Sequence, residues 1–155
     1  MKKIFLATSF SGQVDAQSGK VLPELRAFIE ALLVALRKDD MAEVFCAAEY
    51  EDWMIAGDAP PEVGVQKDLQ EIDAADVVVA LMHAQLSAGV QFELGYAVAK
   101  SKHVILVHHA GQKLTYFNQG AVSSGLITQL AYDNLESLIA QLTIAVHAPA
   151  DDVPA

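Results

Sequence analysis

The sequence is poor in cysteine and in basic residues, and it contains no long apolar run. Its single cysteine, Cys46, excludes an internal disulfide framework and a cysteine-based zinc site, and is interpreted as a small buried hydrophobic residue. Lys and Arg total 10 against 20 Asp and Glu, which gives a net charge of -10. Because a polyanion would be repelled, a nucleic-acid polymer is not an expected partner. No apolar run approaches the roughly 20 residues that cross a membrane, so no membrane partner is expected.

The 155 residues, 53% of them hydrophobic, are enough for one domain with a buried core. We expect this domain to span 1–147 and 148–155 to form a flexible tail. No secretory signal is visible, because Met1-Lys2-Lys3 leads directly into a short apolar segment, and a cytoplasmic location is expected. The five histidines show neither H-x-x-x-H nor H-E-x-x-H spacing, so neither a metal site nor a cofactor is expected.

Short apolar runs alternate with helical patterns along the chain. The runs predict five strands, at 4–7, 44–46, 77–82, 104–107 and 126–132. The helical patterns cover 20–38, 62–74 and 134–147, and a further helix carries Glu93 and runs to about 100, while 49–60 and 110–124 are expected to be loops. Continuous apolar strands indicate a parallel sheet buried on both faces. The predicted fold is α/β: a three-layer sandwich with a five-stranded, mainly parallel sheet and helices on both faces (Rossmann/flavodoxin-like).

The most informative segment joins the third apolar run to the next helix. It reads Ser87-Ala88-Gly89-Val90-Gln91-Phe92-Glu93-Leu94-Gly95-Tyr96. Its small residues would let a ligand approach the backbone, and an anionic group could dock at the helix start. We expect Glu93 in the first helical turn, where the helix dipole would keep it ionised, as a nucleophile must be. An acid in a first turn is also a common structural feature, and spacing alone does not separate the two interpretations.

Two stretches carry a resemblance to a known family. They are Asp68-Leu69-Gln70-Glu71-Ile72-Asp73-Ala74-Ala75-Asp76-Val77-Val78-Val79-Ala80 and Ser87-x-Gly89-Val90-x-x-Glu93-Leu94-Gly95-Tyr96-Ala97-Val98-Ala99. Together they resemble the nucleoside 2-deoxyribosyltransferase superfamily, and within it more closely the nucleoside 5'-monophosphate N-glycosidases. The opening Lys3-Ile4-Phe5-Leu6-Ala7 with its Ser/Phe turn also suits that group. The similarity is good over about 65–107 and weak elsewhere.

The resemblance implies that Glu93 is the nucleophile, which attacks the anomeric carbon and forms a glycosyl-enzyme ester. Asp68 matches the acid that assists departure of the base, provided that a small insertion near 83–86 is assumed. Asp73 and Asp76 compete for that role, and we interpret them as an exposed helix-end acid and a strand-start residue. From chemistry alone, breaking an N-glycosidic bond creates positive charge on the sugar, and two carboxyl groups in different environments suit that reaction.

Ser87 and Gly89 match the family's phosphate contacts. Transferases that act on free nucleosides tend to carry an acid where Ser87 stands, and an acid would repel a phosphate. A serine hydroxyl and the Gly89 N–H would instead bind one. The resemblance therefore implies hydrolysis of a nucleoside or deoxynucleoside 5'-monophosphate to free base and (deoxy)ribose 5-phosphate. A helix N-cap is the structural alternative for Ser87, and the two roles are compatible.

Further binding residues are expected around this centre. Those that follow the first strand should border the sugar and the base: Thr8, Ser9 and Phe10. The resemblance also implies a homodimer or higher homo-oligomer in which a neighbouring subunit completes the site from the segment 116–125. In that segment Asn118 is a candidate sugar contact, and Ser123 or Ser124 a candidate phosphate contact.

Two other functions remain open. One is a nucleoside 2-deoxyribosyltransferase that exchanges bases between nucleosides, against which Ser87 speaks. The other is a non-catalytic nucleotide-binding domain on the same scaffold, because a fold alone does not determine a function. In each case the expected partner is a small nucleotide or nucleoside.

Overall fold

A computed structural model describes residues 1–10, 13–38, 42–54, 59–83 and 87–148. Its strands form one sheet in the order β2-β1-β3-β4-β5, with every pairing parallel. The strands are β1 (Lys2–Thr8), β2 (Ala42–Cys46), β3 (Val77–Met82), β4 (His103–His109) and β5 (Thr128–Tyr132). The helices are α1 (Pro23–Leu36), α2 (Ala47–Tyr50), α3 (Pro61–Ala74), α4 (Ala88–Ala99), α5 (Tyr116–Ser123) and α6 (Leu135–His147).

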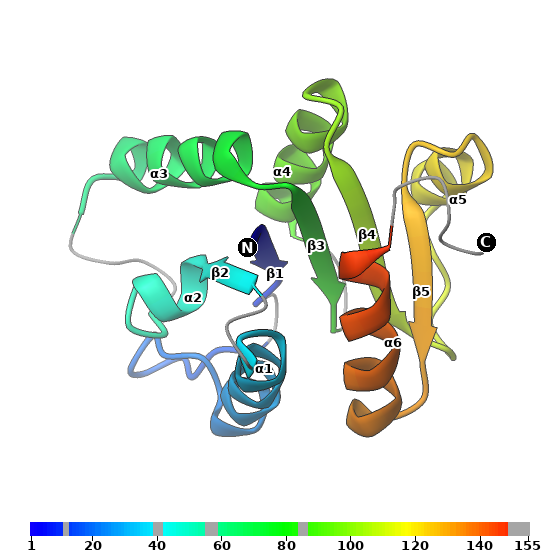
Figure 1. Ribbon diagram of the computed structural model, residues 1–155. Helices are drawn as coiled ribbons and strands as arrows, with labels where there is room; N and C mark the ends of the chain where they lie inside the picture. Colours follow the sequence, from blue (N-terminus) through cyan, green and yellow to red (C-terminus); the bar gives the residue numbers. More distant parts are fainter. Residues whose placement is uncertain (11–12, 39–41, 55–58, 84–86, 149–155) are drawn as a thin grey trace.

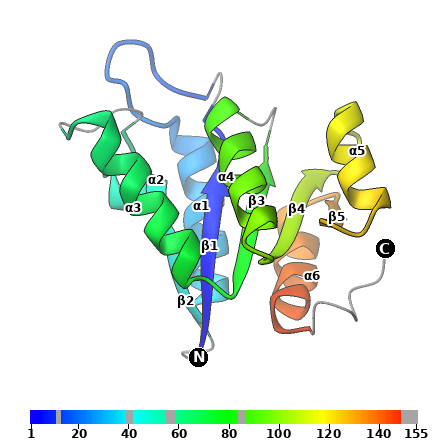
Figure 2. The same ribbon diagram turned by 90° about the horizontal axis from the view of Figure 1, so that it is seen from above.

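Helices cover both faces of the sheet (Figures 1 and 2). In Figure 1, α3, α4 and α5 lie above the sheet, and α1 and α6 lie below it. Side chains of β1 alternate accordingly: Ile4 and Leu6 join the core under α1 and α6, and Phe5 and Ala7 join the core under α3 and α4. All of β3 is buried, which explains its continuous apolar sequence. The predicted three-layer α/β fold with a parallel sheet is confirmed.

Two segments that were expected to be loops contain helices. Residues 47–50 form α2, and residues 116–123 form α5. A four-residue helix is too short to show a periodic pattern, and α2 is held by the burial of the nearby Trp53, whose N–H donates to the Ala48 carbonyl at 2.7 Å. In α5, Gly120 lowers the intrinsic helix preference, and the helix depends on the Thr115 side chain, which accepts from the Asn118 N–H.

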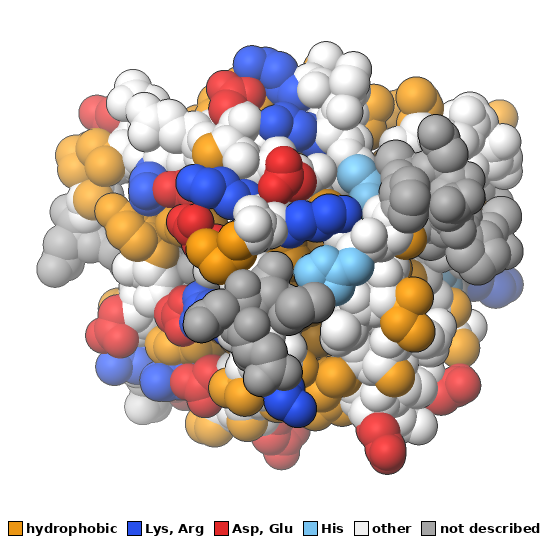
Figure 3. Space-filling model, viewed as in Figure 1, with side chains coloured by type: hydrophobic (Ala, Val, Ile, Leu, Met, Phe, Trp, Pro, Cys, Tyr) orange, Lys and Arg blue, Asp and Glu red, His pale blue; other side chains and the backbone are white. Residues whose placement is uncertain are grey.

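Two lysine side chains at the amino ends of the strands donate hydrogen bonds to carbonyl groups at the carboxyl ends of helices. Lys102 Nζ donates to the carbonyl oxygens of Asp73 and Ala75 at 2.7 and 2.9 Å, and Lys2 Nζ donates to that of Val146 at 2.9 Å. Figure 3 shows Lys and Arg side chains, with histidines beside them, gathered across the face that carries the N-terminus in Figure 1. The ammonium groups of Lys102 and Lys2 stabilise the carboxyl ends of α3 and α6, respectively.

Within the described ranges, no helix has both the length and the apolar character that a membrane crossing requires.

Candidate active site

The structure brings Glu93 of α4 close to Asp68 of α3. Both side chains are half-buried, and neither carboxylate has an ion pair or hydrogen bond with another described residue. Burial and, to a smaller extent, the negative charge of Asp68 together raise the pKa of Glu93 to about 8. The two acids expected to perform catalysis therefore lie within electrostatic reach of each other and lack a cationic partner in the described part of the chain.

The carboxyl group of Asp68 is also shifted. Burial, followed by the charges of Glu51 and Glu71, raises its pKa to about 6, against a partly opposing effect of Lys67. With one pKa above neutrality and the other below it, the pair carries about one proton near pH 7. That proton belongs to the pair, and a bound ligand can change which of the two carboxyl groups holds it.

The expected position and charge of Glu93 were wrong. Helix α4 begins at Ala88, its first turn contains no acid, and Glu93 is its sixth residue. The favourable field of a helix start fades within the first turn, so burial dominates and the pKa of Glu93 rises instead of falling. The helix starts early because Ser87 caps it directly.

The start of α4 presents hydrogen-bond donors at the carboxyl edge of the sheet. Ser87 Oγ accepts from the Val90 N–H at 3.2 Å, so Ser87 is the N-cap, and its own N–H donates to Ser9 Oγ at 3.0 Å. The N–H groups of Ala88 and Gly89 find no acceptor among the described residues. A Cβ at Gly89 would make only an ordinary 3.8 Å contact with Ser87 Oγ, so packing within the chain does not require glycine there.

Of the candidate residues Thr8, Ser9 and Phe10 at the end of β1, Ser9 contacts this helix start. The bond between Ser9 and Ser87 joins the end of β1 to the start of α4, and Ser9 is buried at 3% exposure. Thr8 Oγ1 is buried and has no hydrogen-bond partner in the described part of the chain. Phe10 is partly buried against the core that includes α1. Ser9 is thus a structural link to the helix that carries Glu93, in addition to any contact with a ligand.

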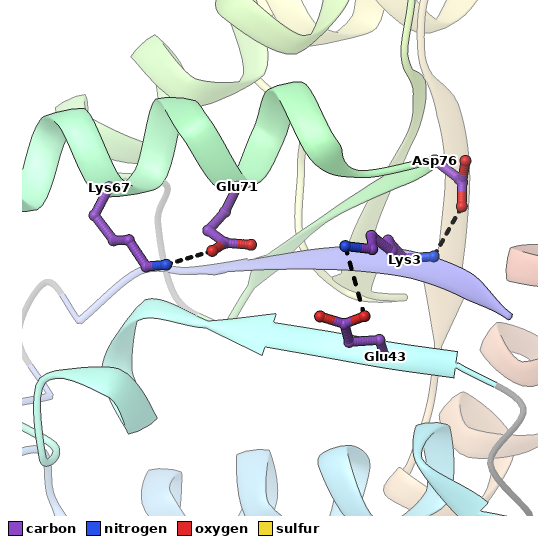
Figure 4. Close-up of polar contacts among 5 residues, drawn as sticks. All are labelled: Lys3, Glu43, Lys67, Glu71 and Asp76. Carbon is purple, nitrogen blue, oxygen red and sulfur yellow. Dashed lines mark hydrogen bonds and ion pairs between the residues drawn. The ribbon is translucent and has the colours of Figure 1, made fainter.

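The two competing acids are engaged elsewhere. Asp73 pairs with Lys100 at 2.9 Å and accepts from the Tyr96 hydroxyl at 3.0 Å. Asp76 accepts from the Lys3 N–H at 2.8 Å, which ties the start of β3 to β1 (Figure 4). Of the three candidate acids on this stretch, Asp68 is the unpaired one and the one that acts on Glu93.

A third carboxyl group near Asp68, that of Glu51, was not predicted from the sequence. It lies on a tight turn in which Asp52 and Trp53 have φ angles of 52° and 61°. Non-glycine residues in this region cost on the order of 1 kcal/mol or more. Trp53 offsets that cost, since it is buried at 4% exposure and its carbonyl accepts from the Val21 N–H at 2.9 Å. The sequence feature that could have indicated Glu51 is Gly64, one helical turn before Asp68. Glu51 Oε1 is 3.3 Å from the position that a Cβ at residue 64 would occupy.

The residues expected to serve a neighbouring subunit lie on or next to α5. Asn118 is buried at 1% exposure and its Nδ2 has no partner among the described residues. Ser123 and Ser124 are exposed, and Ser124 Oγ donates to the Ala121 carbonyl at 3.1 Å. These three residues line a cavity of about 670 Å³ between α4 and α5, and Glu93 is not part of its lining.

Cys46 is buried, and burial raises the pKa of its thiol, as expected for a residue that acts as a small hydrophobic side chain. In the described ranges, no three His, Cys, Asp or Glu side chains are grouped so that they could hold a metal ion.

Comparison with known proteins places this arrangement in context. The family model described as nucleoside 2-deoxyribosyltransferase matches residues 4–129. A curated protein of Syntrophotalea carbinolica, named "Putative 2'-deoxynucleoside 5'-phosphate N-hydrolase 1", is 30% identical over 138 residues, which is 88% of either chain.

Two solved structures have a similar fold. The solution structure of BlsM has a TM-score of 0.75 at 25% identity and covers 94% of this chain and 89% of its own. The CMP N-glycosidase BcmB of Clostridium botulinum has a TM-score of 0.67 at 19% identity and covers 92% of this chain and 98% of its own.

Proposed function

The chain belongs to the nucleoside 2-deoxyribosyltransferase family of enzymes, and from that premise we propose that it hydrolyses the N-glycosidic bond of a nucleoside or deoxynucleoside 5'-monophosphate. The products would be a free base and (deoxy)ribose 5-phosphate. The observation that carries the proposal is the half-buried pair of Glu93 and Asp68, on the two helices beside the carboxyl edge of the sheet, for which the described residues supply no ion pair or hydrogen bond. The name of the Syntrophotalea carbinolica relative points in the same direction.

In the proposed mechanism, Glu93 attacks the anomeric carbon and forms an ester with the sugar. The C–N bond breaks with its electron pair moving to the base, and Asp68 donates its proton to the base. Water then attacks the same carbon, Asp68 takes a proton from that water, and Glu93 leaves as a carboxylate. The cycle returns both groups to their starting states and consumes one water.

The shared proton of the pair fits these roles. The reactive state needs the charge on Glu93 and the proton on Asp68. As the bond to the base breaks, positive charge on the sugar stabilises an ionised Glu93 and so favours the proton on Asp68. A raised pKa in the free protein is therefore compatible with a nucleophile that is charged when the substrate is bound.

This mechanism predicts a bell-shaped pH profile. Above about pH 8 the pair loses its proton and Asp68 can no longer assist the base, and below about pH 6 both groups are protonated and Glu93 cannot attack. Values of kcat/KM measured between pH 4.5 and 9.5 should therefore fall on both sides of neutrality. A flat profile over this range would show that the pair does not supply the groups that react.

The donors at the start of α4 favour a phosphorylated substrate. The N–H groups of Ala88 and Gly89, which have no acceptor among the described residues, lie with the Ser87 hydroxyl at a helix N-terminus, where an anion is stabilised. They lie four to six residues before Glu93, at the start of the helix that carries it. A 5'-phosphate held there would place the sugar toward Glu93.

Ser87→Ala is expected to lower kcat/KM for a 5'-monophosphate by about tenfold or more, because a hydrogen bond to a charged group is lost. The loss for the corresponding free nucleoside should be smaller. Ser137→Ala is the matched control, since the Ser137 hydroxyl accepts from the Asn134 N–H in the capping box of α6, far along the chain. Its loss should reduce stability without changing the ratio of the two substrates. Equal losses for nucleotide and nucleoside in Ser87→Ala would show that Ser87 acts only as a cap.

We also place the active form in a homo-oligomer. Tyr116 and Phe117 are 94% and 80% exposed beside the α4–α5 cavity, and the buried Asn118 amide there has an Nδ2 without a partner among the described residues. A second copy covering this region would bury the two aromatic rings, which is the kind of surface that marks an interaction site. Asn118, Ser123 and Ser124 would then be available to the neighbouring site.

The direct test is a panel of ribo- and deoxyribonucleoside 5'-monophosphates, with release of free base and of sugar 5-phosphate followed by chromatography. Hydrolysis of at least one nucleotide, faster than of its nucleoside, is the expected result. Adding a second free base tests for transfer: base exchange between unphosphorylated nucleosides that outpaces hydrolysis would favour the deoxyribosyltransferase alternative. No base release from any nucleotide by the folded protein would reject the proposal.

A further inference from the structure

We propose that Glu51 selects the base by accepting a hydrogen bond from an exocyclic amino group, so that preferred substrates carry an amino-bearing base such as cytosine or adenine. The oxo counterparts, uracil and hypoxanthine, would be disfavoured. This inference rests on the proposed function, because it names the leaving group at that same site.

Two observations locate the Glu51 side chain. The buried Trp53 anchors the turn that follows it, and Glu51 Oε1 lies 3.3 Å from where Gly64 would carry a Cβ. Gly64 and Asp68 are four residues apart in α3 and so share one face of that helix. Glu51 therefore presents its carboxylate on the helix face that bears Asp68, and a side chain at position 64 would displace it.

Glu49 and Glu71 have cationic partners, whereas Glu51 has none among the described residues. Glu49 pairs with Arg37 at 2.6 Å, and Glu71 pairs with Lys67. The half-buried Glu51 carboxylate has no ion pair or hydrogen bond with any residue that the structure describes. A partly buried acid without a partner is costly, and a ligand that supplies a donor relieves that cost.

Geometry relates the three carboxyl groups. Glu51 Oε1 lies against Gly64, one helical turn before Asp68 on the same face of α3. Glu93 belongs to α4, and Asp68 is the residue of α3 whose charge acts on it. We take Asp68 to lie between the other two. The groups of a bound nucleotide would follow the same order. The phosphate would lie at the start of α4 and the anomeric carbon at Glu93. The edge of the base that carries the glycosidic nitrogen would lie near Asp68, and the opposite edge of the base at Glu51.

A carboxylate at the outer edge distinguishes amino from oxo groups. Cytosine N4 and adenine N6 each carry two hydrogens and donate, whereas the equivalent oxygen of uracil or hypoxanthine only accepts. Two acceptors facing each other repel and leave both unpaired, and a site built to bind a substrate N–H discriminates strongly against an analogue without it. The identity of the group at this one position should therefore decide the rate.

The test uses pairs of nucleotides that differ only in this group: CMP with UMP, AMP with IMP, and the four 2'-deoxy equivalents. For the wild-type protein, the amino member of any cleaved pair should have a kcat/KM at least about tenfold higher. Glu51→Gln should reduce that ratio by about tenfold, mainly through a higher KM for the amino member, because an amide can also donate to an oxo group. Glu62→Gln removes the same charge from an exposed position in the first turn of α3 and should leave the ratio unchanged.

Wild-type protein that cleaves both members of each pair equally would overturn the inference without any variant being needed, and the hydrolysis itself would stand. An unchanged ratio in Glu51→Gln, with catalysis retained, would overturn it in the same way. Wild-type protein that cleaves none of these eight nucleotides but cleaves another member of the larger panel would overturn this inference alone. Failure to cleave any nucleotide would reject the proposed function, and this inference with it.

Discussion

Replacing Glu93 by glutamine is expected to abolish hydrolysis and, at the same time, to make the folded protein more stable. Loss of the nucleophile should lower kcat by at least about a thousandfold, as is typical when a group that forms the covalent intermediate is removed. Glutamine keeps the shape of the side chain, so binding of the nucleotide should persist. Measurement of turnover beside ligand binding separates the two effects.

The stability gain follows from the pKa. Because the pKa of Glu93 is raised from 4.5 to about 8 in the folded protein, the folded state binds more protons than the unfolded state between these values. The free energy of unfolding therefore falls as the pH rises through this window. Glutamine has no charge to bury, so Glu93→Gln should gain roughly 1–3 kcal/mol at pH 8 and much less at pH 4.5.

Thermal unfolding at several pH values measures this gain, at about 2–4 °C per kcal/mol for a chain of this size. Glu136→Gln is the control: it removes a carboxylate of the same charge from an exposed position in the first turn of α6. Because that carboxylate is not buried, the substitution should not stabilise the protein. A variant that loses activity but is destabilised by the same amount at pH 5 and pH 8 would contradict the raised pKa.

Asp68→Asn should lower kcat by about a hundredfold or more, because the departing base then receives no proton. The alkaline limb of the pH profile should disappear with that proton. The pKa of Glu93 should also decrease, since the neighbouring negative charge is gone, and the acid limb should move to lower pH. Steady-state kinetics across the pH range report both changes.

A substrate whose base needs no proton provides the sharper measurement. The 5'-monophosphate of 7-methylguanosine already carries positive charge on the base, so its loss of rate in Asp68→Asn should be much smaller. Asp73→Asn is the matched control on the same helix: it breaks the pairing with Lys100 and Tyr96 and should leave catalysis nearly intact. Equal losses for both substrates in Asp68→Asn would contradict a role in protonating the base.

Local patterns predicted the sheet well because β3 and its neighbours are buried on both faces. A strand such as Val77–Met82 cannot hide a polar residue, so its sequence alone identifies it. The short helix α2 could not be found this way, since it depends on Trp53 reaching a core formed by distant segments. The same is true of α5, in which the preference of the individual residues for helix is weak.

The site shows a similar division. Ser87 and Glu93 could be proposed from the sequence because one short segment holds them in fixed spacing, and Asp68 was proposed through resemblance. The electrostatic state of Glu93 could not be predicted, because it is determined by burial and by a charge on another helix. Glu51 could not be found either, since its place beside Asp68 depends on two segments that meet only in the folded chain.

The lysines at the amino ends of the strands have a consequence for how a substrate arrives. Lys2 and Lys102 direct their charges into carbonyl groups at helix ends, on the side away from the start of α4. With a net charge of -10, the protein then offers an incoming nucleotide a repulsive long-range field and attraction only at close range. Encounter with the substrate should consequently become faster as ionic strength increases, the reverse of the behaviour of an electrostatically steered enzyme.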